Sequence, residues 1–358
     1  MKQIKNKLIL CFISVFLCAC TNQDQNQKPN SNIASEQIQN LDFFEINNEV
    51  PVAKSSTINQ IQKIVHPTNN MTKSNHKKVL NGVQTTFHKN GEVHVKSTYK
   101  DGVLNGPYQA FYKDGQLQVS CNYINNKLEN VYRSYHKNGQ LESDRFYINH
   151  KLTNTYTEYY PNRNLKTVVN YLNGQYHGKN KNFYPNGQIQ LIQFFDKNVR
   201  HKVYQEFFLN GNLKLQSFYI NGKLNKKHIQ YYDNGQVLDV TTYRDDKANG
   251  PYISYFKNGN IKSKGQFVNH LSHGTFYNYY DTQTIKDETN YKQGELSGIY
   301  KAYYKNGKPK VLASYKNGKL SGLYIEYDQN QKVTRSESFV DGKPLVGFND
   351  KVEKLRKK

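Results

Sequence analysis

A 24-residue repeat runs without insertion or deletion from Gly82 to Leu345. This stretch of the 358-residue chain holds eleven units, whose positions we number as places 1 to 24. The units begin at Gly82, Gly106, Asn130, Asn154, Gly178, Lys202, Lys226, Gly250, Gly274, Gly298 and Gly322. A fixed period of this length indicates one supersecondary unit copied along an array.

The sequence of each unit predicts a β-hairpin. In residues 303–322, YYKNGKPKVLASYKNGKLSG, Asn-Gly lies between tyrosine-rich, alternating segments, which is a strong hairpin signal. Pro161 and Pro185 stand at place 8, where a two-residue loop would need a backbone N–H. Proline suits the second position of a type I turn, with Asn third and a left-handed Gly closing a three-residue loop. We therefore expect place 7 to pair with place 11, and place 6 with place 12.

Aromatic residues recur at fixed places of the unit. Places 6 and 18 are aromatic in all eleven units, and place 12 is Val, Leu or Ile everywhere except Pro309. These places are an even number of residues apart, so we expect them to share one buried face. Places 3 and 7, aromatic in eight of eleven units each, should face the other way. On this hypothesis Tyr255→Ala, at place 6, costs more stability than Tyr252→Ala, at place 3.

A row of tyrosines at places 3 and 7 is the candidate binding face, because tyrosine offers a large contact area and a hydrogen-bonding tip. The alternative is that both faces are purely structural. The candidate residues are Tyr108, Tyr112, Tyr156, Tyr160, Tyr252, Tyr300 and Tyr304.

The predicted fold class is all-β. Two strands per unit give 22 strands in an elongated, single-layer antiparallel sheet of tandem hairpins. The right-handed twist of strands should twist or coil this sheet.

The first residues, MKQIKNKLILCFISVFLCAC, are typical of a bacterial secretion signal: three lysines precede an apolar run from Leu8 to Leu17. The closing Leu17-Cys18-Ala19-Cys20 resembles a lipobox. We expect residues 1–19 to be a lipoprotein signal peptide and Cys20 to carry lipid. A plain cleaved signal and an uncleaved anchor are the alternatives.

The rest of the chain divides by composition. Residues 20–76 are rich in Asn, Gln and Ser and predict a disordered tether from Cys20. Residues 77–345 form the predicted array, and residues 346–358 a basic C-terminal cap or tail. Cys121 is the one cysteine of the predicted array, so no disulfide within the array can hold the fold.

The formal net charge of +22 favours anionic partners. An envelope protein, an anionic polymer and a lipid headgroup all fit this charge, besides the membrane that holds the N-terminal lipid. Basic residues among aromatics also resemble a stacking groove for nucleic acid, but the secretion signal argues against that partner. Composition does not indicate an oligomeric state.

No motif in the sequence indicates catalysis. His177 and His201 occupy the same place in successive units, about 10 Å apart on a sheet, which is too far for two ligands of one zinc ion. No nucleophile elbow, HExxH helix or paired-cysteine motif occurs. We therefore expect no metal site, no cofactor and no enzymatic activity.

The recurring Tyr-x-Asn-Gly, the following Leu and Gly-x-Tyr-x-x-Tyr-Tyr, as at residues 298–307, resemble the MORN-repeat variant of bacterial proteins catalogued as YwqK-type and antitoxin-like. The resemblance covers residues 82–345, but the paired G-x-G glycines of the classical MORN unit are absent. It implies hairpin architecture strongly and function weakly. We expect a non-enzymatic lipoprotein of the bacterial envelope that binds or scaffolds, located at the outer membrane or cell surface. The alternative is an antitoxin or immunity protein that neutralises a cognate toxin.

Overall fold

The computed structural model describes residues 79–345, which form an all-β structure. The predictions for the signal peptide, Cys20, the tether and the C-terminal tail lie outside these residues. Within residues 79–345, no helix is long and apolar enough to cross a membrane.

Twenty-two long strands and three strands of two residues make up the described part of the chain. The first half of the array contains β1 (Gly82–Phe87), β2 (Val93–Lys100), β3 (Val103–Phe111), β4 (Leu117–Ile124), β5 (Lys127–Tyr135), β6 (Leu141–Ile148), β7 (Lys151–Tyr159), β8 (Leu165–Leu172), β9 (Gln175–Tyr176), β10 (Gly178–Phe183), β11 (Ile189–Asp196) and β12 (Val199–Phe207). The second half contains β13 (Leu213–Ile220), β14 (Lys223–Tyr231), β15 (Val237–Arg244), β16 (Lys247–Tyr255), β17 (Ile261–Val268), β18 (Leu271–Tyr279), β19 (Ile285–Lys292), β20 (Glu295–Leu296), β21 (Gly298–Tyr303), β22 (Pro309–Lys316), β23 (Lys319–Tyr327), β24 (Val333–Val340) and β25 (Lys343–Pro344).

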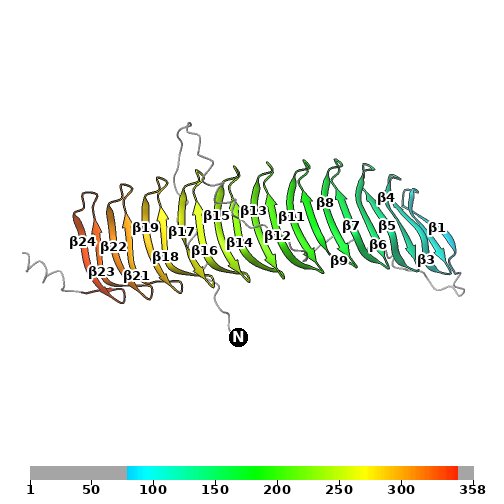
Figure 1. The fold of residues 1–358 in the computed structure, drawn as a ribbon. Helices are drawn as coiled ribbons and strands as arrows, with labels where there is room; N and C mark the ends of the chain where they lie inside the picture. The colour runs from blue at the N-terminus through cyan, green and yellow to red at the C-terminus, as the bar shows by residue number, and fades with distance from the viewer. Residues whose placement is uncertain (1–78, 346–358) are drawn as a thin grey trace, which may run out of the picture. The chain divides into compact units, whose positions relative to one another are not determined.

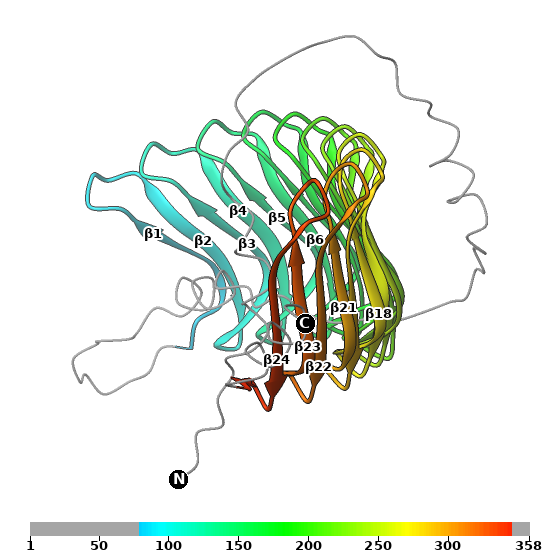
Figure 2. The same cartoon turned by 90° about the vertical axis from the view of Figure 1, so that its left-hand side faces the viewer.

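The strands form one open antiparallel meander, in which each long strand pairs with the next long strand along the chain. The short strands β9, β20 and β25 each pair with the long strand before them. Figure 1 shows the hairpins following one another along a single layer, and Figure 2 shows the twist that accumulates from β1 to β24. The predicted fold class is confirmed.

The three-residue loop at one end of each hairpin is also confirmed. In the fourth unit the Tyr160 N–H donates to the Asn164 carbonyl at 2.8 Å, and the Arg163 N–H donates to the Tyr160 carbonyl at 2.9 Å. The same two bonds recur around Pro185. The chain at place 10 is left-handed throughout, as the turn requires.

The predicted partition of the two faces is wrong, because each hairpin contains a bulge. In the tenth unit Tyr303 pairs with Pro309 as expected, but Ala302 pairs with Val311, so Lys310 is an extra residue without a partner. The shift recurs next to place 6 in every unit. One extra residue reverses the alternation of side chains, so places 12 and 18 point to opposite faces.

Ring contacts confirm which places share a face. Tyr300 at place 3 meets Tyr315 at place 18 with ring centroids 6.3 Å apart, and Tyr303 lies an odd number of residues from Tyr300 along the regularly paired β21. Tyr303 and Tyr315 therefore leave the sheet on opposite sides. The same ring contact between places 3 and 18 occurs in seven further units, with His228 at place 3 in one of them.

The pairings define two faces. The aromatic face consists of places 3, 5, 14, 16, 18 and 23, and the lysine face consists of places 2, 4, 6, 12, 15 and 17. The buried cluster of the array lies on the aromatic face: Tyr108, Ala110, Cys121, Tyr123 and Tyr132 pack with aliphatic residues of places 14 and 23. The sheet has one layer, so no second sheet covers its apolar side chains. Edge-to-face contacts between neighbouring rings bury part of this apolar surface instead.

The frequent glycine at place 1 is explained by the backbone conformation that this place adopts. Place 1 has positive φ in all eleven units, and it lies in the irregular stretch between successive hairpins. At Gly106, φ is 125° and a Cβ would lie 3.0 Å from the Thr98 side chain, and Gly250 has the same relation to Thr242. Other residues at this place, such as Lys226, occupy the left-handed region at φ 62°.

Candidate binding surfaces

The four tyrosines predicted at place 3 pack into the aromatic face. Tyr108 is 8% exposed and belongs to the buried cluster. Tyr252 contacts Phe267, and Tyr300 contacts Tyr315, through edge-to-face rings. Burial raises the pKa of Tyr300 to about 12, helped by the nearby charge of Asp287. Except for Tyr108, these side chains keep partial exposure.

The three tyrosines predicted at place 7 link neighbouring hairpins. Tyr112, Tyr160 and Tyr304 each donate a hydrogen bond to the backbone carbonyl at place 6 of the next unit, at 2.8, 3.0 and 2.7 Å. Tyr184, Tyr232 and Tyr280 make the same bond, and His88 and His136 reach the same carbonyl through Nε2. The recurrence of tyrosine at place 7 thus has a structural explanation.

Charged residues are segregated between the two faces, which sequence reasoning missed. No lysine occurs at any of the six places of the aromatic face in the eleven units. That face carries six carboxylates, Glu158, Glu206, Asp239, Asp287, Glu326 and Glu337, and three arginines, Arg145, Arg200 and Arg335. A place-by-place count of lysine would have found the segregation once the bulge was known.

A recurring polar group lies on the aromatic face. In it, a place-3 tyrosine donates its hydroxyl to a glutamate two residues later, and an arginine lies over the tyrosine ring. Tyr156 donates to Glu158 at 3.0 Å, with the Arg145 guanidinium 5.0 Å from its ring centroid. Tyr204 and Tyr324 repeat the arrangement with Glu206 and Arg200, and with Glu326 and Arg335. The arginines of this face are thus held by tyrosines.

The lysine face carries six lysines, Lys96, Lys179, Lys181, Lys227, Lys264 and Lys301, and Arg133, against the two carboxylates of Asp144 and Glu288. Arg133 pairs with Asp144 at 3.5 Å, and Lys301 pairs with Glu288 at 3.1 Å. Lys179 lies 5.6 Å from the ring centroid of Phe194. The result is an excess of positive charge beside aromatic rings on one side of the sheet.

Side chains with the potential for chemistry are engaged in the fold. Burial raises the pKa of the Cys121 thiol to about 12, so the thiol is protonated at neutral pH. His177 Nδ1 lies 3.0 Å from the buried carboxylate of Asp196, and His201 Nδ1 accepts the Asn221 N–H at 3.5 Å. In residues 79–345, no group of three His, Cys, Asp or Glu side chains could hold a metal ion.

Seven stretches of the chain match the family model described as MORN repeat variant: residues 80–101, 104–125, 128–149, 176–197, 200–221, 248–269 and 296–317. Each begins two residues before a unit of our numbering. No curated protein sequence matches the chain.

Two solved structures are similar over most of the array but only at low scores. The crystal structure of TcdB2-TccC3 has 13% identity and a TM-score of 0.13, over 72% of this chain and 18% of that chain. A porin-like protein from Bacteroides uniformis has 10% identity and a TM-score of 0.15, over 74% of this chain and 91% of that chain. The chain thus spans less than a fifth of the first structure's length, and these scores support no inference.

The family match and the hairpin sheet agree with each other. The chain carries tandem MORN-variant repeats, which suggest a binding or scaffolding module.

Proposed function

We propose that this chain is a non-enzymatic, lipid-anchored protein of the bacterial envelope whose repeat array binds an anionic partner through the lysine face. The observation that carries the proposal is the distribution of charge: lysine is absent from the six places of the aromatic face and exceeds carboxylate at the six places of the lysine face. Lys166 and Lys214, at the extra residue of place 13, form ion pairs with Glu158 and Glu206 of the aromatic face and partly neutralise its carboxylates. A stable sheet needs no such segregation, since lysines scattered over both faces would serve solubility equally well.

The aromatic rings of the lysine face support the same function. Lys264 lies 5.1 Å from the ring centroid of Tyr277 and 5.6 Å from that of Tyr279. A ring beside an ammonium group gives contact area next to a charge, and this combination suits an extended acidic partner. Equivalent places recur on every second strand, about 10 Å apart, so a long partner would meet the same chemistry repeatedly.

The seven tyrosines predicted from the sequence are a second proposed contact surface, because six of them are half-buried rather than buried. These tyrosines also stabilise the array through ring packing and the place-7 hydrogen bonds. A loss of binding after their substitution is therefore informative only if the variant is shown to be folded. The two surfaces are therefore tested side by side.

The experiment is capture from the envelope fraction with residues 20–358 as bait. One variant replaces the exposed lysines Lys96, Lys179 and Lys227 with glutamine, and the other replaces Tyr252, Tyr300 and Tyr304 with serine. We expect an acidic partner that salt releases and that the folded lysine variant fails to capture. Unchanged capture by that folded variant would refute the lysine face, and loss in a folded tyrosine variant would favour the second surface.

The antitoxin alternative is tested by the same capture. A captured toxin, together with rescue of cells from it by this chain, would replace the scaffolding role.

A further inference from the structure

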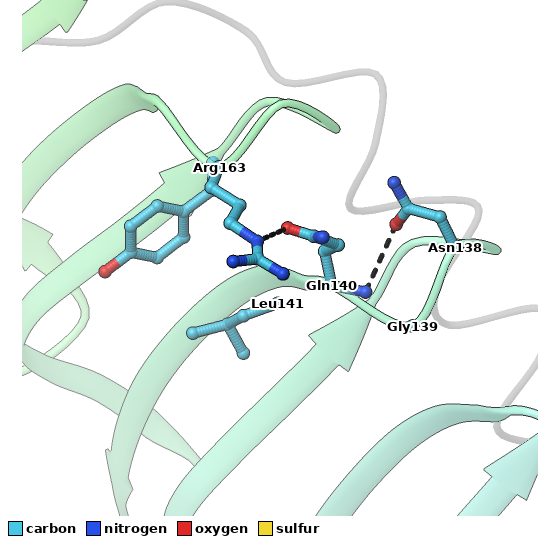
Figure 3. Close-up of a pocket in the computed structure, with 6 residues that line it drawn as sticks. Asn138, Gly139, Gln140, Leu141 and Arg163 are labelled. Atoms are coloured by element: carbon cyan, nitrogen blue, oxygen red, sulfur yellow. Dashed lines mark hydrogen bonds between the residues drawn. The ribbon is translucent and has the colours of Figure 1, made fainter.

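A hollow of about 490 Å³ lies between the loops of the third and fourth units. It is lined by residues 138–141 of one hairpin and by Tyr159 and Arg163 of the next. Figure 3 shows the Arg163 side chain extending back toward Gln140 and Leu141 of the preceding hairpin. Small-molecule sites are typically hollows of roughly 300–1,000 Å³ with few polar groups on apolar walls. Leu141 and the Tyr159 ring form the apolar part of a lining whose other residues are Gly139 and the polar Asn138, Gln140 and Arg163.

Arg163 is an unusual residue for its position. Place 10 closes the three-residue loop in the left-handed conformation, and glycine occupies it in eight of the eleven units. Arg163 adopts this conformation at φ 71° although it has a side chain. Strained positions of this kind often occur at functional sites.

The arginine and amide side chains of the hollow keep unpaired donors, whereas their acceptor oxygens are occupied. The Arg163 Nε–H donates to the Gln140 Oε1, so this side-chain acceptor is occupied. Asn138 is also engaged: its Oδ1 accepts the Gln140 N–H at 3.1 Å, and its Nδ2 donates to the Pro161 carbonyl at 3.1 Å. The terminal guanidinium nitrogens of Arg163 and the amide nitrogen of Gln140 remain as donors. The lining residues include one cation and no carboxylate.

We propose that this hollow binds an oxyanion, a carboxylate or phosphate group carried by a small ligand, through the guanidinium of Arg163. The planar fork of arginine can donate two parallel hydrogen bonds to either group. The Tyr159 ring and Leu141 then contact the apolar part of the ligand. This proposal goes beyond the proposed function, because the hollow can bind a small anion whether or not the lysine face binds a partner.

The array supplies a matched control. Gln283 stands at place 10 of the ninth unit, is also left-handed at φ 67°, and donates its Nε2 to the Asn260 Oδ1 of the preceding loop at 2.7 Å. Gln283 therefore shares the strain and the loop-to-loop hydrogen bond of Arg163 but lacks the guanidinium. Substitution of either residue by glycine installs the residue that most units carry at place 10, so both variants should fold.

The test is calorimetric titration of the array at low ionic strength with inorganic phosphate and, separately, with glucuronate. We expect saturable binding of at least one anion, weakened at least tenfold in Arg163→Gly and unchanged in Gln283→Gly, with Tm unchanged or raised in both variants. Arg163→Lys, which keeps the charge but loses the fork, should also weaken binding. Binding of phosphate alone or glucuronate alone would identify the ligand group.

Three results would overturn the proposal. They are the absence of saturable binding of both anions, full binding by Arg163→Gly, and equal loss of binding in Gln283→Gly. Leu141 and Tyr159 stand at places 12 and 6 of the lysine face, but Lys96, Lys179 and Lys227 do not line the hollow. Their substitution by glutamine should leave anion binding intact, which separates the hollow from partner binding by these lysines.

Discussion

The Phe276 side chain lies so close to Gly265 that it leaves no room for a larger residue at this position. Gly265 stands at place 16 on the aromatic face, and a Cβ built on it would lie 2.4 Å from Cδ1 and Cε1 of Phe276. The Phe276 ring is 8% exposed and lies between Phe267 and Tyr291, with centroid distances of 5.5 and 5.3 Å. The ring cannot retreat without losing one of these contacts. We therefore expect Gly265→Ala to destabilise the array.

Two opposing effects set the size and sign of this change. Alanine in place of glycine within a strand normally stabilises by roughly 0.5–1 kcal/mol, because the unfolded chain loses freedom. Overpacking a filled core typically costs about 1–3 kcal/mol. Since 2.4 Å is far below any real Cβ contact, the clash should dominate and leave a net loss of about 1–2 kcal/mol. The sign of the change in the free energy of unfolding is enough for the test: a loss of stability means that the Phe276 ring is fixed over Gly265.

The assay is urea unfolding followed by tyrosine fluorescence, with amide exchange of β17 and β18 as the local readout, because repeat arrays need not unfold in one step. The double variant Gly265→Ala, Phe276→Leu should recover part of the loss, since leucine can vacate the space. Gly274→Ala is the control: its Cβ would meet nothing within 4 Å, so its left-handed φ of 72° is its only penalty and Phe276→Leu should not relieve it. A Gly265→Ala variant as stable as the natural chain would refute the reasoning.

Four further predictions follow from the same contacts and from the sequence. Tyr252→Ala should cost about 3 kcal/mol and more than Tyr255→Ala, by chemical denaturation, because Tyr252 packs in the aromatic face; a larger loss at Tyr255 would contradict the faces. Tyr304→Phe should cost about 1 kcal/mol by leaving the carbonyl of the next hairpin unpaired, and an unchanged midpoint would argue against the place-7 bond. Burial raises the pKa of Asp239 to about 6, so the folded chain keeps a proton that the unfolded chain releases above its ordinary pKa of 3.8. The free energy of unfolding should therefore fall as pH rises between these values. Asp239→Asn should remove this pH dependence and add about 2 kcal/mol of stability at neutral pH. An unchanged pH dependence in the variant would exclude Asp239 as its cause. Cys20→Ser should release the protein from membranes, and retention of the variant after a salt wash would contradict lipidation.

The period, the hairpins and the loop type can all be read from the order of the amino acids. Local chemistry suffices for these, because Pro161 and Pro185 exclude a two-residue loop wherever they stand. Such preferences act within a few residues, so they are readable without knowing what lies across the sheet.

Which residues share a face, and hence which surface could bind, became known only from the fold. A single extra residue, such as Lys310, moves each side chain that follows it in the strand to the opposite face of the sheet. The residue types found at that place do not predict a bulge. The grouping of Tyr300 with Tyr315, the absence of lysine from the six places of the aromatic face, and the approach of Arg163 to Gln140 all depend on strand register across hairpins. Register is set by the pairing of whole strands and by the packing of rings such as Phe276 over Gly265. These contacts join residues that local sequence patterns do not connect.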